Sequence, residues 1–449
     1  KGEEVEMGSY IANSKRQQEE MLDAMGMTGM DELYRVIPDE VKLEGSLDIP
    51  DGISEMEVKN KISSIAEKNK AFKSIFRGGG AYNHYIPAIV KQVTSKEEFV
   101  TAYTPYQAEI SQGILQSIFE YQTMICQLTG MDVSNASVYD GATAAAEAVL
   151  MSISRKKKSV LVSETVNPQT IETIRTYLSG RGIEIIIVPS KDGKTDIEAL
   201  KENVNDEAAC VLIQHPNYYG QLEDADEIGD IVSNAKAKYI ISSNPIALGI
   251  IKSPGEYGAD IAVGEGQPLG MPLAFGGPYL GFMATTDKLM RQLPGRIVGQ
   301  TVDSKGERAF VLTLQAREQH IRRERATSNI CSNQALCAMT AAVYLGAMGK
   351  KGLEQVATLS MSKAHYLAEE ICKIDGYELV YKGDFFHEFV TTCKGDVDKV
   401  MKHLQQHGIL GGYPLAGEDE GQILWCATEM NTKEEIDRLV ELLKEVDSI

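Results

Sequence analysis

A regular alternation of helices and apolar strands between residues 142 and 284 constrains the fold of this chain more than any other feature. The pattern predicts helices at 142–154, 168–179, 196–203 and 224–236, and strands at 159–163, 184–188, 210–214, 239–242, 260–263 and 280–284. The strands are continuous β-branched and apolar runs, which is typical of a parallel sheet covered by helices on both faces. We therefore predict an α/β fold with a doubly wound, mostly parallel sheet. Such sheets bind ligands at the carboxyl ends of their strands.

The remaining regions predict additional parts around this sheet. In chain order we predict an N-terminal helical extension (1–75), the large sheet domain (76–332), a long helical connection (333–374) and a smaller C-terminal α+β domain (375–449). Two alternatives stay open for residues 1–6, which are either native or a remnant of expression ahead of a start at Met7.

The charge and cysteine content exclude several function classes. A formal net charge of −19 disfavours binding to nucleic acid or to an anionic membrane surface, because the field of the protein repels phosphates. The first residues, KGEEVEMGSY, are charged and lack an apolar h-region, so we expect no secretory signal, and no apolar run is long enough to span a membrane. Its seven cysteines form no CxxC pair, so we predict a reduced, cytoplasmic, soluble protein without a metal site.

A glycine-rich region after the predicted strand 260–263 is unusual in its side chains. Residues 253–287 contain no lysine, arginine or histidine. The segment 264–270 superficially suggests a dinucleotide-binding loop, but Pro268 and Pro272 would block the helix that must follow such a loop. The sequence therefore argues against binding of a nicotinamide cofactor.

Residues 139–143 stand between a strand-like segment and a predicted helix. Free amides at the helix N-terminus, with the Thr143 hydroxyl, could receive a phosphate. An ordinary Asp/Gly helix entry explains the same residues equally well, and Asp140 would disfavour an anion.

Three other polar segments are candidates for a functional site. Arg323, Thr327 and Ser328 lie in a segment rich in arginines and hydroxyls, which suits a phosphate or carboxylate, although a solvated charge run is the usual alternative. Residues 101–113 place Tyr103, Tyr106 and Gln107 at a loop-to-helix junction, where tyrosine can both stack and hydrogen bond. The segment FRGGGAYNHYIPAIV (76–90), which includes His84, predicts an ordered loop.

These segments together resemble the P-protein family of the glycine cleavage system, in its two-subunit form, and specifically its first subunit. The resemblance covers nearly the whole chain. It is carried by FRGGGAYNHYIPAIV, TAYTPYQAEISQGILQSIFEYQTMICQLTGMDVSNASVYDGATAAAEA, GEGQPLGMPLAFGGPYLGFMAT and HIRRERATSNICSNQALCAM.

The resemblance implies a fold-type I pyridoxal-phosphate (PLP) architecture and a partner subunit that holds PLP on a lysine. In this chain the lysine position falls within Gln267, Pro268 and Leu269, and none of these can form an imine. The acidic residue that pairs with the cofactor ring falls within 242–244, where no carboxylate stands. Two such losses imply a subunit that is inactive alone and holds no covalent cofactor.

The activity implied for the complete enzyme is decarboxylation of glycine on PLP and transfer of the aminomethyl group to the lipoamide of H-protein. A heterotetramer with the second P-protein subunit is the implied assembly. We hypothesise that Tyr103, Tyr106 and Gln107 help to form the glycine and lipoyl pocket, with His84 as a further candidate at the substrate site or interface.

A second hypothesis is that Thr327 and Ser328, with Arg323 behind them, approach the phosphate of the partner's PLP. Two alternatives stay open. The chain could be a purely structural or docking subunit, or an independent PLP enzyme that uses another lysine such as Lys252.

Overall fold

The structure is a computed structural model that describes residues 13–43, 45, 47–274 and 276–446. The undecided segment 1–6 lies outside the described residues. The chain divides into an N-terminal unit that ends at Lys70 and a main unit that begins at Ala71. The boundaries predicted at 332 and 374 lie inside the main unit and stay predictions.

The N-terminal unit contains two helices, each started by a capping box. Helix α1 (Lys15–Ala24) follows Ser14, and helix α2 (Glu55–Ala66) follows Ser54. In each box the serine hydroxyl accepts from the backbone three residues later, and that residue's side chain accepts from the serine backbone. The turns η1 (Met30–Tyr34) and η2 (Asp39–Val41) lie between them.

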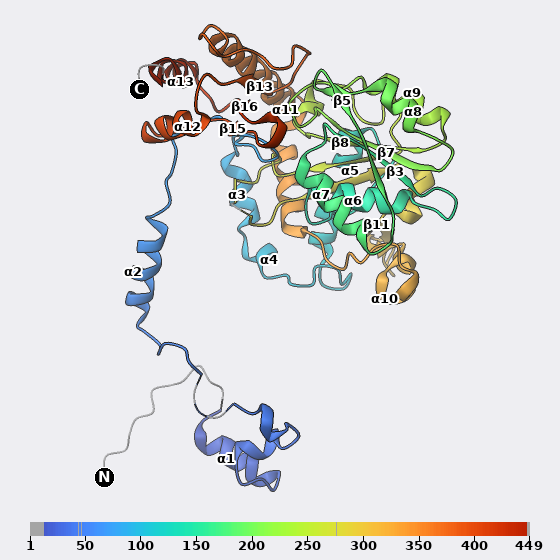
Figure 1. Ribbon diagram of the computed structural model, residues 1–449. Helices are drawn as coiled ribbons and strands as arrows, with labels where there is room; N and C mark the ends of the chain where they lie inside the picture. The colour runs from blue at the N-terminus through green and yellow to red at the C-terminus, as the bar shows by residue number, and fades with distance from the viewer. Residues whose placement is uncertain (1–12, 44, 46, 275, 447–449) are drawn as a thin grey trace. The chain divides into compact units, whose positions relative to one another are not determined.

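A seven-stranded sheet forms the centre of the main unit (Figure 1). Its strands, in spatial order, are β2 (Val133–Ser134), β10 (Gly281–Thr285), β9 (Ile261–Glu265), β8 (Lys238–Ser243), β7 (Ala208–His215), β3 (Ser159–Ser163) and β4 (Ile185–Val188). Strands β9, β8, β7, β3 and β4 are parallel, and β10 pairs antiparallel with both β9 and β2. The predicted mostly parallel sheet is therefore confirmed, with one reversed strand.

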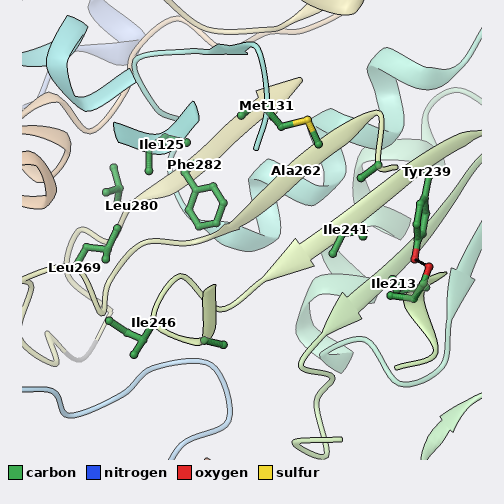
Figure 2. Close-up of a cluster of buried hydrophobic side chains, with 14 of the residues drawn as sticks. Ile125, Met131, Ile213, Tyr239, Ile241, Ile246, Ala262, Leu269, Leu280 and Phe282 are labelled. Carbon is green, nitrogen blue, oxygen red and sulfur yellow. Dashed lines mark hydrogen bonds between the residues drawn. The ribbon is translucent and has the colours of Figure 1, made fainter. Parts of the chain in front are cut away.

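Helices cover both faces of this sheet because alternate strand residues point to opposite sides. On one face, Leu212 and Ile240 pack against helices α6 (Gly141–Ser152) and α7 (Pro168–Ser179). On the other face, Ile213 and Ile241 belong to a core that includes α5 (Gln112–Thr129) and α11 (Ala335–Ile371). Figure 2 shows this second cluster, where the Tyr239 hydroxyl donates to the Ala225 carbonyl at 3.0 Å.

The other elements of the main unit connect or flank the sheet. They are β1 (Ser74–Ile75), α3 (Ala88–Thr94), α4 (Glu97–Val100), β5 (Ser190–Lys191), β6 (Lys194–Thr195), α8 (Ile197–Asn203), α9 (Ala225–Asn234), η3 (Ala247–Gly249), η4 (Asp287–Gln292), β11 (Ile297–Val302), β12 (Arg308–Thr313), η5 (Gln315–Arg317), α10 (Gln319–Arg322) and η6 (Arg323–Arg325). Strands β11 and β12 form an antiparallel hairpin that the sequence pattern did not predict.

The C-terminal part packs around a core of its own. Its elements are β13 (Glu388–Thr392), α12 (Val397–Gln406), β14 (Ile409–Leu410), β15 (Tyr413–Pro414), η7 (Gly417–Asp419), β16 (Gln422–Cys426) and α13 (Lys433–Val446). Strand β1 pairs with β14, so residues just after the N-terminal unit are joined to this part. Trp425 is fully buried in this core, and its indole donates to the Thr391 hydroxyl at 2.9 Å.

The helices and strands predicted between residues 142 and 284 agree with the structure to within a few residues. Ahead of them, residues 107–111 form turns, so α5 begins only at Gln112. The long helix of the predicted connection, α11, begins at Ala335. In the C-terminal part, Leu379 makes a single bridge to Thr391.

Candidate functional site

A polar cleft lies where the fold predicts a ligand, at the carboxyl ends of the central strands. It has a volume of about 330 Å³. Gln214 from β7, Ser243 from β8 and Glu265 from β9 line it, together with the N-terminus of α6 and the glycine loop 78–80. The size is that of a small-molecule site.

The glycine loop is anchored from two directions. Glu388 of β13 accepts hydrogen bonds from the Gly79 amide at 2.6 Å and from the Tyr82 hydroxyl at 2.7 Å. A Cβ at Gly78 would stand 2.1 Å from Glu388 Oε1, so only glycine fits there. Burial raises the pKa of Glu388 to about 7.

Gln267 is the second anchor of this loop. Its side-chain oxygen accepts from the Tyr82 amide at 2.9 Å, and its side-chain nitrogen donates to the carbonyls of Tyr82 and Met271 at 3.0 and 2.7 Å. Gln267 is 1% exposed, and the neighbouring Leu269 is fully buried in the cluster of Figure 2. The predicted lysine position therefore holds side chains that stabilise the fold.

Two carboxylates occupy the N-terminus of α6. Asp140 accepts from the Thr143 amide at 2.7 Å, as an N-cap. Glu265 accepts from the amides of Gly141 and Gln267 at 2.9 Å each, and from the Leu280 amide at 3.1 Å. Burial raises the pKa of Glu265 to about 7, although the three amides oppose the shift. Two of the amides that could receive a phosphate, those of Gly141 and Thr143, are thus already bonded to the protein's own carboxylates.

The floor of the cleft is formed by the end of β8. Ser243 Oγ and Asn244 Nδ2 are buried there without a hydrogen-bond partner. The Asn244 side-chain oxygen instead accepts from the Ile246 amide at 2.9 Å. This is the segment in which the sequence lacks a carboxylate.

Outside the cleft, the structure brings two of the predicted segments together. We call residues 101–111 and 319–334 the loop pair. The Tyr106 hydroxyl bonds to Asn333, and the Arg296 guanidinium lies 3.9 Å from the centre of the Tyr106 ring. Arg296 also donates to the Cys331 carbonyl at 3.2 Å. These contacts join both members of the loop pair to the start of β11.

Within the loop pair, the predicted side chains differ in exposure. Tyr103 is 96% exposed, whereas Tyr106 is half-buried and Gln107 is exposed. Burial raises the pKa of Tyr106.

On the other loop, Arg323 and Thr327 are exposed and Ser328 is half-buried. Arg323 has a φ of 53°, in the left-handed region. The Thr327 carbonyl accepts from Arg181 at 3.1 Å, and the Ser328 side chain bonds to the buried Glu147. Burial raises the pKa of Glu147 to about 7.

His84 is separate from this surface. It is buried, and its Nδ1 lies 2.7 Å from Glu429. Glu429 also accepts from the Tyr85 amide at 2.7 Å. His84 therefore ties the glycine-loop segment to the C-terminal part, and it is not among the residues that line the cleft.

Comparison with known proteins assigns this architecture. The family model of the glycine cleavage system P-protein matches residues 8–443. A probable glycine dehydrogenase (decarboxylating) subunit 1 from Desulfitobacterium hafniense is 49% identical over 98% of this chain and 100% of its own length. A protein of the same description from Carboxydothermus hydrogenoformans is 50% identical over 97% of this chain and 99% of its length. The chain belongs to the glycine cleavage system P-protein family.

Solved structures agree. An inhibitor-bound glycine decarboxylase (P-protein) superposes with a TM-score of 0.92 at 40% identity, covering 98% of this chain and 100% of that one. A Lactobacillus brevis glutamate decarboxylase is similar in fold alone, with a TM-score of 0.68 at 12% identity over 91% of this chain and 96% of that one. The P-protein chain therefore has the predicted fold-type I PLP architecture. Among its described residues, every helix is too short or too polar to cross a bilayer.

The cleft of this P-protein chain does not fit PLP. Its described lining contains no lysine, and Lys252 is exposed and paired with Asp226 at 2.9 Å. Asp140 and Glu265 stand where a phosphate would bind, and Asn244 cannot protonate a pyridine nitrogen as a carboxylic acid can. We therefore derive no chemical step in this cleft.

Sequence reasoning missed several residues that organise the site. Glu265 and Gln267 lie in the glycine-rich region, whose interpretation was based on its lack of lysine, arginine and histidine. Gln267 was named there only as part of the lysine position. The partners Arg296, Asn333 and Glu388 come from distant elements, so no spacing pattern indicated them. One feature of the sequence could have indicated them. A Glu and a Gln in an otherwise glycine-rich and apolar segment need hydrogen-bond partners within the protein if they are buried.

Proposed function

We propose that this chain is the subunit of a glycine cleavage P-protein that lacks the cofactor lysine and completes the active site of a partner subunit. The relatives described as subunit 1 support a second subunit, and the P-protein family supports glycine decarboxylation on PLP. The aminomethyl group would pass to the lipoamide of H-protein. The assembly would be a heterotetramer, and this chain alone would be inactive.

One observation carries this proposal. At the chain's own cleft, the amides of Gly141 and Thr143 are bonded to Glu265 and Asp140. Tyr103, in contrast, is almost fully exposed and lies in a segment joined to the arginine-rich loop. An exposed tyrosine offers a ring that can stack and a hydroxyl that can hydrogen bond, which suits a contact with another subunit. The loop pair is therefore the part of this chain best suited to enter another subunit's site.

The roles follow from the chemistry of each group. PLP, held covalently by the partner, supplies the electron sink for loss of the glycine carboxylate. Tyr103, Tyr106 and Gln107 would form a wall of the glycine and lipoyl pocket, excluding water and hydrogen bonding to polar atoms. Thr327 and Ser328 would approach the PLP phosphate, Thr327 donating its hydroxyl hydrogen bond, with Arg323 adding positive charge. His84 would act indirectly, by holding the glycine loop.

Turnover in the reconstituted two-subunit enzyme tests these roles. We expect Tyr103→Phe and Thr327→Ala each to lower kcat/KM for glycine by about 10-fold or more, as loss of a hydrogen bond to a charged or reacting group predicts. Matched controls are Tyr413→Phe and Thr176→Ala, which alter exposed side chains outside the loop pair. Unchanged turnover and glycine affinity in both test variants would refute the placement and favour a purely structural or docking subunit.

The absorbance spectrum with added PLP tests the division between subunits. The purified chain should develop no protonated imine band near about 420 nm, whereas the band should form once the second subunit is added. A stable band from the chain alone, trapped by borohydride on one of its own lysines, would overturn the proposal.

A further inference from the structure

Three side chains of metal-ligand type meet on the C-terminal part of the main unit. His403 lies in α12, His407 follows directly after that helix, and Glu445 lies in α13. One ligand atom of each lies within 4.8 Å of the others. Residues four apart in a helix share one face, which explains why the two imidazoles stand together. Their ring centroids are 4.6 Å apart.

The two imidazoles are held in different ways. His403 is mostly buried, with its side chain 12% exposed, and its Nε2 makes no hydrogen bond. The closest carboxylate oxygen, Oε2 of Glu445, lies 3.5 Å away. His407 has its Nδ1 3.0 Å from the His403 carbonyl oxygen, so Nδ1–H is the donor and Nε2 keeps its lone pair. A backbone contact of this kind orients an imidazole for metal binding.

The two carboxylate oxygens of Glu445 face different groups. Its Oε1 faces Arg438 at 3.7 Å, and the same guanidinium nitrogen is closer to Glu441, at 3.2 Å. Its Oε2 faces His403. Since Arg438 has a nearer carboxylate, Oε2 stays available as a ligand.

We propose that His403, His407 and Glu445 bind a zinc ion that joins α12 to α13. Two imidazoles and one carboxylate are a ligand set that Zn²⁺ takes at about 2.0–2.2 Å, with water in the fourth position. Tetrahedral ligands at that distance lie about 3.4 Å apart, so modest side-chain rotation closes the present separations. The side chains of His407 and Glu445 are exposed, so they can rotate in this way. Imidazole donors favour zinc over magnesium, which prefers oxygen ligands.

This site lies outside everything the proposed function uses. The ligands come from two helices that pack against each other through Val400, Leu404 and Leu443. A metal there would strengthen an existing contact. The absence of CxxC pairs in the sequence predicted no metal site, and the third ligand of this one, in α13, is far along the chain from the histidine pair.

Calorimetric titration of the metal-free full-length chain with ZnCl2 tests the proposal. We expect one saturable site with micromolar or tighter affinity, and no comparable binding of MgCl2. His407→Gln and Glu445→Gln should each weaken zinc binding by about 10-fold or more, the loss that even indirect ligand changes produce. His320→Gln and Glu434→Gln, at exposed positions outside the cluster, are the matched controls and should bind zinc as the native chain does.

Three results would overturn the site. They are no saturable zinc binding, equal affinity in His407→Gln and the native chain, or binding that disappears only when the exposed Cys331 and Cys372 are replaced by serine. Because the altered side chains are exposed, the variants are expected to fold. Unchanged melting temperatures without zinc would check this.

Discussion

The cleft and the loop pair of this P-protein chain are opposites in how their polar groups are used. At the cleft, Glu265 accepts three backbone hydrogen bonds, and Gln267, which anchors the glycine loop, makes three with its side chain. In the loop pair, Tyr103 is 96% exposed. A fold can therefore keep the shape of a cofactor site while its own carboxylates bond to amides that a phosphate would use. The loop pair instead presents an exposed side chain that can bind another molecule.

Restoring a lysine at Gln267 is the strongest way to break this comparison. Gln267→Lys would leave the buried Tyr82 amide without its acceptor and place a charge at a position 1% exposed. We expect a loss of about 4 kcal/mol in the free energy of unfolding. Denaturant unfolding measures it, and Gln169→Lys, an exposed residue at the same cleft, is the control.

The same variant tests whether lysine alone restores cofactor binding. We expect no stable imine band with added PLP, because Asp140 and Glu265 still occupy the phosphate position and no carboxylate faces the ring. A stable band would show that the missing lysine was the only barrier. The hydrogen bonds of Asp140 and Glu265 would then not be what prevents this subunit from binding PLP.

The sequence predicted the sheet well and its internal bonding poorly, for a physical reason. Strand β3 and helix α7 occur as expected at 159–163 and 168–179, because local apolar pattern and caps determine them. The contact of Glu388 with Gly79 joins segments far apart in the chain, and no local pattern encodes it. The hairpin of β11 and β12 was not predicted, because the residues next to its turn are exposed and do not follow the apolar pattern of a buried strand. Candidate residues were found by type, but their partners required the fold.

A pH titration of stability sharpens the contrast on the cleft side. Burial raises the pKa of Glu388 from about 4.5 to about 7, so the folded chain binds an extra proton between these values. Stability from this group is fully present below about pH 4.5 and is lost as the pH rises to about 7. The shift corresponds to about 3 kcal/mol. Glu388→Gln cannot ionise, so this part of the descent should vanish from its curve of unfolding free energy against pH.

Comparison with a second variant isolates the effect. Glu378→Gln makes the same change at an exposed position of the same part and should retain the native pH dependence. Glu147 and Glu265 keep their own titrations in both variants. If the curves of Glu388→Gln and the native chain run parallel from pH 4.5 to 7, the prediction is wrong. Burial would then not raise the pKa of the Glu388 carboxyl.

The smallest expected effect concerns the contact that holds the loop pair together. Arg296 stacks on Tyr106 at 3.9 Å and donates to the Cys331 carbonyl. Lysine keeps the charge but loses the planar fork, so Arg296→Lys should cost about 1 kcal/mol of stability. Arg308→Lys is the control, because Arg308 lies 5.7 Å from the Phe310 ring on the adjacent hairpin and should cost less.

A double-mutant cycle with Tyr106→Phe separates stacking from hydrogen bonding. Phenylalanine keeps the ring but loses the bond to Asn333. If Arg296 acts by stacking, its replacement should cost the same in either background, and coupling should be near zero. In the reconstituted enzyme, Arg296→Lys should raise KM for glycine in addition to lowering the melting temperature of the chain. A loop pair that only stabilises the fold would change stability and leave KM unaltered, which would place the wall of the glycine pocket elsewhere.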